Sequence, residues 1–104
     1  MTQFNVHRNT NIESRKSVPY LLDIQHPLLS SLDSRIAIPL IPIPKDQPPI
    51  GKLNPLCELE GKQYLIKTQN LAVVSPAQLG AKVLDLSARR FEIIAAIDLL
   101  ISGI

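Results

Sequence analysis

Hydrophobic and polar residues alternate over most of the chain, and a longer helical pattern follows near its end. The alternation over residues 3–7 predicts a strand with Phe4 and Val6 facing inward. A more continuous apolar run over residues 19–25 is typical of a central strand with apolar neighbours on both faces. The polar residues 8–17 between them predict a hairpin loop.

The middle of the chain keeps β-character but is rich in proline. Residues 35–43 predict a strand, yet Pro39 and Pro42 have no N–H to donate to a neighbouring strand. We therefore expect this strand to lie at a sheet edge or to bend. Six of the nine prolines fall between Pro39 and Pro55, which predicts a stiff loop over residues 42–51.

The clearest turn signal is Glu60-Gly61, because glycine readily adopts the positive φ that a two-residue hairpin turn needs. This turn joins predicted strands at residues 53–59 and 62–68. Residues 71–74 predict one more short strand, and residues 76–84 are compatible with a helical turn or a loop.

Residues 87–104 predict the one long helix. Ser87 can cap its first turn, and no helix-breaking residue follows until Gly103. The apolar residues fall on two neighbouring faces at helical spacing: Phe91, Ile94, Ile97 and Ile101 on one, and Ile93, Ala96 and Leu100 on the other. A small domain can cover only one face with its own sheet, so we expect a partner subunit to cover the other.

The elements together predict a single domain over residues 1–104, with an α+β, β-rich fold of five or more short antiparallel strands and a terminal helix. A formal net charge of +2 is too small to indicate specific nucleic-acid binding or an anionic membrane surface. A single cysteine, Cys57, excludes an internal disulfide and fits a reducing cytoplasm. Residues 1–16 are too polar for a signal peptide, and no apolar run approaches the roughly 18 residues of a membrane span. We therefore expect a cytoplasmic protein.

No catalytic or metal-binding pattern is visible in the sequence. The only histidines, His7 and His26, are not near a serine, cysteine or carboxylate in a recognisable pattern. The aspartates are scattered singly, and the four glycines form no phosphate-binding loop. We expect no metal, no cofactor and a protein that acts by contact rather than as an enzyme, with a small nuclease as the disfavoured alternative.

Short motifs that run through the whole chain carry a family resemblance: QFNV at 3–6, ESR at 13–15, LDIQ at 22–25, RIAIPL at 35–40, LNP at 53–55, LDLS at 84–87 and AIDLLISGI at 96–104. In order and spacing the sequence resembles the CcdB-type toxins of bacterial toxin–antitoxin modules. The resemblance implies an SH3-like antiparallel β domain with a long C-terminal helix, and a homodimer whose terminal helices lie near the two-fold axis.

The resemblance also implies a target. Toxins of this family insert the end of the terminal helix between the arms of the gyrase A-subunit dimer and trap gyrase with cleaved DNA. The positions that correspond to the gyrase-binding residues are Leu28, Leu29, Asp98, Ile101, Ser102, Gly103 and Ile104.

Two of these positions differ from a well-known member of the family, which has tryptophan at the position of Ser102 and asparagine at that of Asp98. A tryptophan packed on an arginine supplies about 1 kcal/mol or more of cation–π energy, which serine does not. The sequence thus leaves two hypotheses. One is a toxin that poisons gyrase, and the other is a toxin-derived interaction module that binds an antitoxin but no longer poisons gyrase.

A second surface implied by the resemblance binds the antitoxin. In this family a disordered C-terminal antitoxin tail wraps the toxin dimer, partly along the N-terminal hairpin loop, and removes it from its target. Glu13, Ser14 and Arg15 are the corresponding residues here, with the loop around Asp46 as a further contact. Without the resemblance, these residues indicate only a solvated loop.

Overall fold

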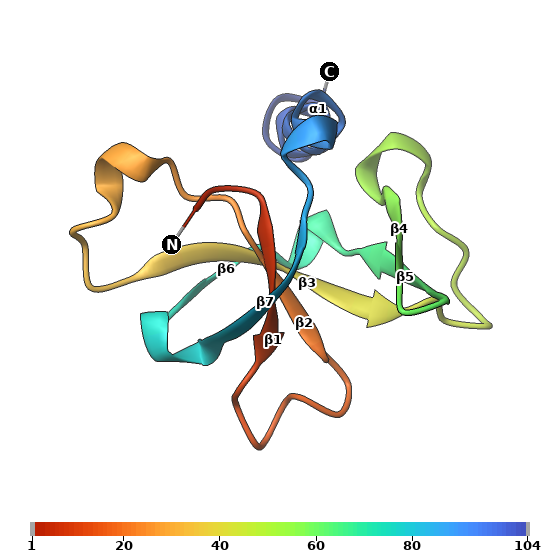
Figure 1. Ribbon diagram of the computed structural model, residues 1–104. Helices are drawn as coiled ribbons and strands as arrows, with labels where there is room; N and C mark the ends of the chain where they lie inside the picture. The colour runs from red at the N-terminus through yellow and green to blue at the C-terminus, as the bar shows by residue number, and fades with distance from the viewer. Residues whose placement is uncertain (1, 104) are drawn as a thin grey trace.

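Seven antiparallel strands and one terminal helix form the fold in the computed structural model, which describes residues 2–103 (Figure 1). The strands are β1 (Asn5–Asn9), β2 (Tyr20–Asp23), β3 (Arg35–Pro42), β4 (Leu56–Leu59), β5 (Lys62–Ile66), β6 (Ala72–Val74) and β7 (Leu79–Asp85). The helix α1 spans Arg90–Ser102. Short 3₁₀ turns join these elements: η1 (Pro27–Leu29), η2 (Gly51–Leu53), η3 (Thr68–Asn70), η4 (Pro76–Gln78) and η5 (Ser87–Arg89).

The strands form one sheet in the order β4-β5-β3-β2-β1-β7, and β6 pairs with the first part of β3. The sheet curls into a half-barrel, and Figure 1 shows α1 lying above it. This arrangement confirms the expected α+β, SH3-like architecture. Among residues 2–103, no helix has the length and apolar run needed to cross a bilayer.

One face of the curled sheet carries the main core, to which alternate residues of five strands contribute. Leu86 and Ile93 cover this core from the helix side, and its other buried members are Phe4, Val6, Tyr20, Leu22, Ile38, Leu40, Cys57, Leu59, Tyr64 and Ile66. Leu21, Ala37 and Leu79 form a smaller cluster on the opposite face. All four residues of β2 are therefore buried, as its continuous apolar run predicts.

Of the two alternatives expected for β3, a sheet edge or a bend, the edge is wrong, because β3 pairs with β2 on one side and with β5 and β6 on the other. The Pro39 carbonyl accepts a hydrogen bond from the Lys67 N–H, at 3.0 Å. The N–H and carbonyl of one strand residue point to the same side, so the N–H that Pro39 lacks would also point away from β2. On that side the partner of β3 changes from β6 to β5. A central strand tolerates this proline because the hydrogen-bond ladder is already interrupted there.

Two turn predictions have opposite outcomes. The Glu60-Gly61 hairpin is confirmed, since Leu59 pairs with Lys62 and both turn residues have positive φ, 51° and 78°. The prediction of a helical turn or loop over residues 76–84 is wrong for most of that segment, because η4 is followed by the edge strand β7. β7 pairs with β1 through two register shifts, which break the alternation that would have revealed a strand.

The terminal helix begins later than predicted. Ser87 lies in η5 rather than at the N-cap of α1, and its side chain makes no capping hydrogen bond. Instead, the Ser87 N–H donates to Asp85 Oδ1 at 2.8 Å. This contact lowers the pKa of the Asp85 carboxyl. The glycine stop is confirmed, since Gly103 adopts φ 77° and its N–H donates to the Leu99 carbonyl at 3.0 Å.

Candidate functional site

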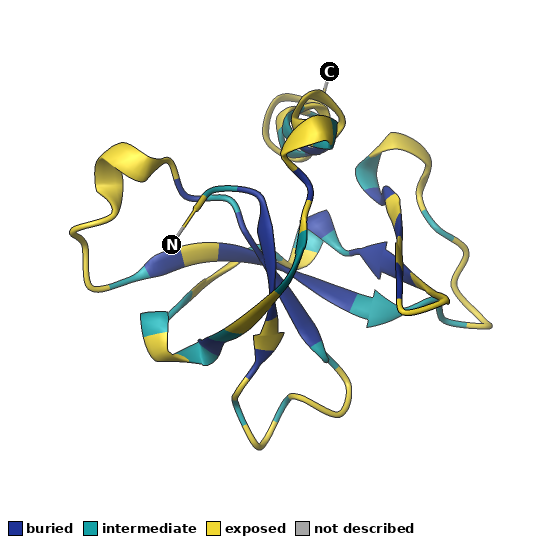
Figure 2. Cartoon of the chain, viewed as in Figure 1, coloured by how far each residue is buried: buried dark blue, intermediate teal, exposed yellow. Residues whose placement is uncertain are grey.

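The exposed side of α1 carries both polar and apolar residues, and neither of the two predicted apolar faces is wholly buried or wholly exposed. Ile93 and Ala96 are buried, with Ile93 in the main core, but Leu100 of the same predicted face is 38% exposed. The side chains of Phe91 and Ile101 are 80% and 77% exposed, and Ile94 and Ile97 between them are half-buried. The exposed side of α1 thus includes large apolar side chains as well as the polar Glu92 and Asp98. Figure 2 shows exposed positions along this helix.

The end of α1 projects its last side chains into solvent. Asp98, Ile101, Ser102 and Gly103 are all exposed. The Ser102 hydroxyl donates to the Asp98 carbonyl at 2.7 Å, so Ser102 bonds to the helix backbone and leaves Ile101 as the large apolar group. The predicted site residue Ile104 lies outside the described residues.

The second predicted segment, Leu28 and Leu29, forms most of the 3₁₀ turn η1 between β2 and β3. His26 begins this turn, because its Nδ1 atom accepts a hydrogen bond from the Leu28 N–H at 3.1 Å. Leu28 is 85% exposed, and Leu29 is exposed as well. Figure 2 shows the connection between β2 and β3 largely in the colour of exposed residues. Leu32 is also exposed in the same connection, and the sequence did not indicate it as a site residue.

The structure links the two segments through the backbone of Phe4. The Phe4 N–H donates to the Asp23 carbonyl at 2.6 Å, and the Phe4 carbonyl accepts from the Leu86 N–H at 2.8 Å. Phe4 therefore connects the end of β2, which leads into η1, with the segment that leads into α1. Phe4 has φ 69°, an unusual value for a residue other than glycine. α1 itself packs mainly on η2, η3 and η5, so η1 and the end of α1 are two separate exposed apolar elements.

The predicted antitoxin segment lies in the loop between β1 and β2, where Glu13 and Arg15 are exposed. Ser14 has a structural role: its hydroxyl accepts from Asn9 Nδ2 at 3.0 Å, and its carbonyl accepts from the Val18 N–H at 2.8 Å. The loop is therefore ordered from within, which leaves the side chains of Glu13 and Arg15 free to face a partner.

The comparison with protein families decides which family this fold and these segments represent. A model described as "CcdB protein" matches residues 3–103. The chain belongs to the CcdB family. Family membership supports the coarser form of the sequence-based hypothesis, the toxin of a toxin–antitoxin pair. Among curated proteins, none matches this sequence.

A solved structure shares the fold of this CcdB-family chain. It is described as "Endoribonuclease in complex with its cognate antitoxin from Mycobacterial species" and aligns with a TM-score of 0.75. The alignment covers 98% of this chain and 95% of the other, at 11% sequence identity. At that identity the likeness shows a common fold, and the activity in the description belongs to the other protein.

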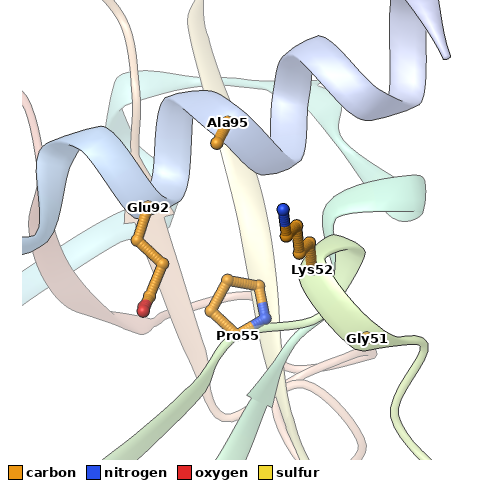
Figure 3. A pocket seen from close by; sticks show the side chains of 5 residues that line it. All are labelled: Gly51, Lys52, Pro55, Glu92 and Ala95. Carbon is orange, nitrogen blue, oxygen red and sulfur yellow. The ribbon is translucent and has the colours of Figure 1, made fainter. Parts of the chain in front are cut away.

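An open cavity of about 440 Å³ lies between α1 and η2 of the CcdB-family domain (Figure 3). It is lined by Gly51, Lys52, Pro55, Glu92 and Ala95. Figure 3 shows Glu92 extending from the helix and Lys52 from η2, with Pro55 between them. Among residues 2–103, none of the predicted gyrase-binding or antitoxin-binding residues lines this cavity.

His7 and Cys57, which could in principle act as a base and a nucleophile, are both buried in this CcdB-family domain. His7 is buried, and its Nδ1 atom lies 2.8 Å from the Gly80 carbonyl across the β1–β7 pair. Cys57 is buried as the sequence indicated, and burial raises the pKa of its thiol. Within residues 2–103 no three histidine, cysteine or acidic side chains gather as a metal site would require.

Proposed function

We propose that this protein is a toxin that binds the gyrase A subunit with the C-terminal end of α1, assisted by η1, and traps gyrase on cleaved DNA. The observation that carries the proposal is the exposure of Ile101 and Leu28 in a member of the CcdB family. Fully burying an aliphatic side chain of this size stabilises by about 1.5–3 kcal/mol. Two such side chains on each subunit can therefore act as anchors for a protein partner.

We propose further that the active form is a homodimer. The exposed side of α1, which carries Phe91, has no cover within the described residues, and a second copy of the same face would provide it. An isologous contact would place the two helix ends together, since a two-fold axis presents the same residues from each subunit. Sedimentation equilibrium of the purified protein tests this proposal, and a monomer at micromolar concentration would refute it.

Neutralisation in this proposal comes from an antitoxin whose disordered tail contacts the exposed Glu13 and Arg15 of the β1–β2 loop. The solved structure of the same fold is described as bound to its cognate antitoxin. One acidic and one basic side chain can each pair with a charge of a flexible peptide, although such exposed pairs are individually weak. The double variant Glu13→Ala/Arg15→Ala should weaken antitoxin binding while it leaves gyrase binding unchanged.

The proposed protein acts by contact rather than by catalysis. Neither histidine is arranged as a general base: the ring of His7 is buried, and the Nδ1 atom of His26 accepts the Leu28 N–H. The description of the structural relative as an endoribonuclease makes the alternative worth testing. Cleavage of RNA by the purified protein in the absence of gyrase would overturn the non-enzymatic proposal.

The main experiment measures binding of the purified full-length protein to the isolated arm domain of the gyrase A subunit. We expect a complex at micromolar concentrations or below. Ile101→Ser should weaken that complex, whereas Val73→Ser, a similarly exposed aliphatic position on β6, should leave it unchanged. If the wild-type protein forms no complex, the gyrase proposal is wrong.

Cell growth separates this proposal from a toxin-derived module that binds the antitoxin without poisoning gyrase. Induced expression in a gyrase-sensitive host should stop growth, and deletion of residues 102–104 should restore it. The truncated protein should still bind the antitoxin, because Glu13 and Arg15 belong to a different element. Normal growth with the intact chain would favour the module. Ser102 motivates this alternative, because serine lacks the aromatic ring of the tryptophan found at this position in a well-known family member.

A further inference from the structure

The hydrogen-bond ladder between β2 and β3 opens at its last residue pair, Ile24 and Ile36. The register places these residues opposite each other, and the Ile24 N–H donates to the Ile36 carbonyl at 3.1 Å. In a regular antiparallel pair the Ile36 N–H would return the bond to the Ile24 carbonyl. Here two glutamine side chains take its place. Gln25 Oε1 accepts from the Ile36 N–H at 3.1 Å, and Gln3 Nε2 donates to the Ile24 carbonyl at 3.0 Å.

The carboxamide of Gln25 also reaches into the turn that follows. Its Nε2 atom donates to the Leu29 carbonyl at 2.8 Å, so one buried side chain connects the start of β3 with the end of η1. The orientation of this carboxamide is determined by its partners, since a backbone N–H can only donate and a carbonyl can only accept. No other uncharged side chain of similar length offers both functions.

The backbone of Gln25 is anchored as well. Its N–H donates to Asp23 Oδ1 at 3.0 Å, and Asp23 Oδ2 pairs with Arg35 Nη2 at 2.6 Å. Both charged side chains are almost completely buried. A buried pair of this kind is strongly destabilised by loss of one partner, so it holds Gln25 in place. The residues that lead into η1 are thus held in place by buried contacts, although the turn itself is exposed.

We propose that Gln25 is a positioning residue that holds η1 so that Leu28 and Leu29 face the target. This inference rests on the proposed function, because it assigns a purpose to the orientation of the turn. Gln25 would not contact the target itself, since its side chain is buried. Its contribution would come from a turn that is ordered before binding, which lowers the entropic cost of forming the complex.

Amide hydrogen exchange of the full-length protein tests the structural half of the inference without any partner. In Gln25→Met, whose side chain has similar length but no amide, exchange at Leu32 and Ile36 should accelerate about tenfold. Leu32 reports on the turn because its N–H donates to the Leu29 carbonyl at 3.1 Å. Gln25→Glu keeps an acceptor for the Ile36 N–H but loses the donor to the Leu29 carbonyl. It should therefore accelerate amide exchange at Leu32 and leave exchange at Ile36 unchanged.

Gln3→Met is the matched control, because it removes a glutamine from the same ladder opening without touching η1. It should leave exchange at Leu32 unchanged. Unchanged exchange at Leu32 in Gln25→Met would overturn the inference, whatever the protein binds. A thermal melt of each variant confirms that the domain is folded during the measurement.

The functional half needs a double-mutant cycle with the gyrase A-subunit arm domain. Gln25→Met should weaken binding about tenfold in the wild-type background, an effect comparable to one hydrogen bond. In the Leu28→Ala/Leu29→Ala background the same substitution should weaken binding less than twofold, because both side chains that Gln25 positions are gone. Equal losses in both backgrounds would refute a role through the turn. If the wild-type protein binds no arm domain, the proposed function fails and the functional half fails with it, while the exchange data still decide whether Gln25 holds η1.

Discussion

Ile93 and Ile101 are the same residue type, about two turns apart in one helix, yet Ile93 is 1% exposed and Ile101 is 77% exposed. The difference arises because the two residues lie on different apolar faces of the helix and at different distances along it. Ile93 lies over the half-barrel and joins the main core, whereas Ile101 belongs to the last turn of α1. Leu22 and Leu28 repeat the contrast on either side of the end of β2, one fully buried and the other 85% exposed.

This comparison teaches that apolar residues have two separate roles in this CcdB-family protein. Inside the half-barrel they stabilise the fold, and at η1 and the end of α1 they form exposed surface that contributes little to folding. Stability and target binding should therefore respond to different substitutions.

The buried pair Asp23–Arg35 should show the largest stability effect. Arg35→Met leaves the Asp23 carboxylate buried without its partner, which should lower the free energy of unfolding by about 3–5 kcal/mol. Urea denaturation at one fixed protein concentration measures the change. The double variant Asp23→Leu/Arg35→Met should recover much of the loss, because no charge is then buried. A single variant as stable as wild type would show that the pair is not needed.

The two isoleucines of α1 provide the direct test of the comparison. Ile93→Ala should destabilise the fold by about 2–5 kcal/mol through loss of burial and the cavity it leaves. Ile101→Ala should change stability by no more than about 0.5 kcal/mol, since the side chain is exposed. Binding to the gyrase arm domain should show the opposite order. Ile101→Ala should weaken binding directly, and this loss of binding should exceed the loss that follows from a smaller folded fraction of Ile93→Ala. Similar unfolding curves for both variants would contradict the separation.

Gly61 should show that an exposed position is not always tolerant. It has φ 78° in the β4–β5 turn, a conformation that costs a residue with a Cβ atom about 1–2 kcal/mol. Gly61→Ala should reduce stability by about that amount, although no atom lies close enough to clash with the new methyl group. Gln63→Ala, exposed in the adjoining strand, is the control and should have little effect. Thermal unfolding followed by circular dichroism distinguishes the two.

Asp85 should produce the smallest effect, visible only in acid. The hydrogen bond from the Ser87 N–H lowers the pKa of this carboxyl below its ordinary value of 3.8. The carboxylate therefore adds stability above that value, and the contribution disappears as pH falls through the lowered folded pKa. Asp85→Asn should flatten the acid limb of a plot of Tm against pH below about pH 4. Asp46→Asn in the exposed proline-rich loop serves as the control, and an equal flattening there would exclude a specific role for Asp85.

Local signals in the sequence were sufficient for several elements. The alternation correctly indicated that Phe4 and Val6 are buried, although the strand is Asn5–Asn9 rather than residues 3–7 and Asn5 and His7 are buried as well. The apolar run of residues 19–25 marked a central strand. Glu60-Gly61 and Gly103 marked a hairpin turn and a helix end, because both depend on a backbone conformation that glycine adopts at low cost. The family motifs also indicated which segments to examine for function, namely Leu28, Leu29 and the end of α1.

Other features depended on contacts between residues far apart in the chain, which no local pattern records. Pro39 fits a central strand only because β6 is replaced by β5 as the partner at that point. β7 forms a strand because it pairs with β1 in spite of two register shifts. The side chain of Asp85, rather than that of Ser87, accepts a hydrogen bond in the turn before α1. The sequence determined that α1 has two apolar faces. The burial of Ile93 in the core and the exposure of Ile101 follow from the tertiary structure alone, because they depend on which face and which turn of α1 the half-barrel covers.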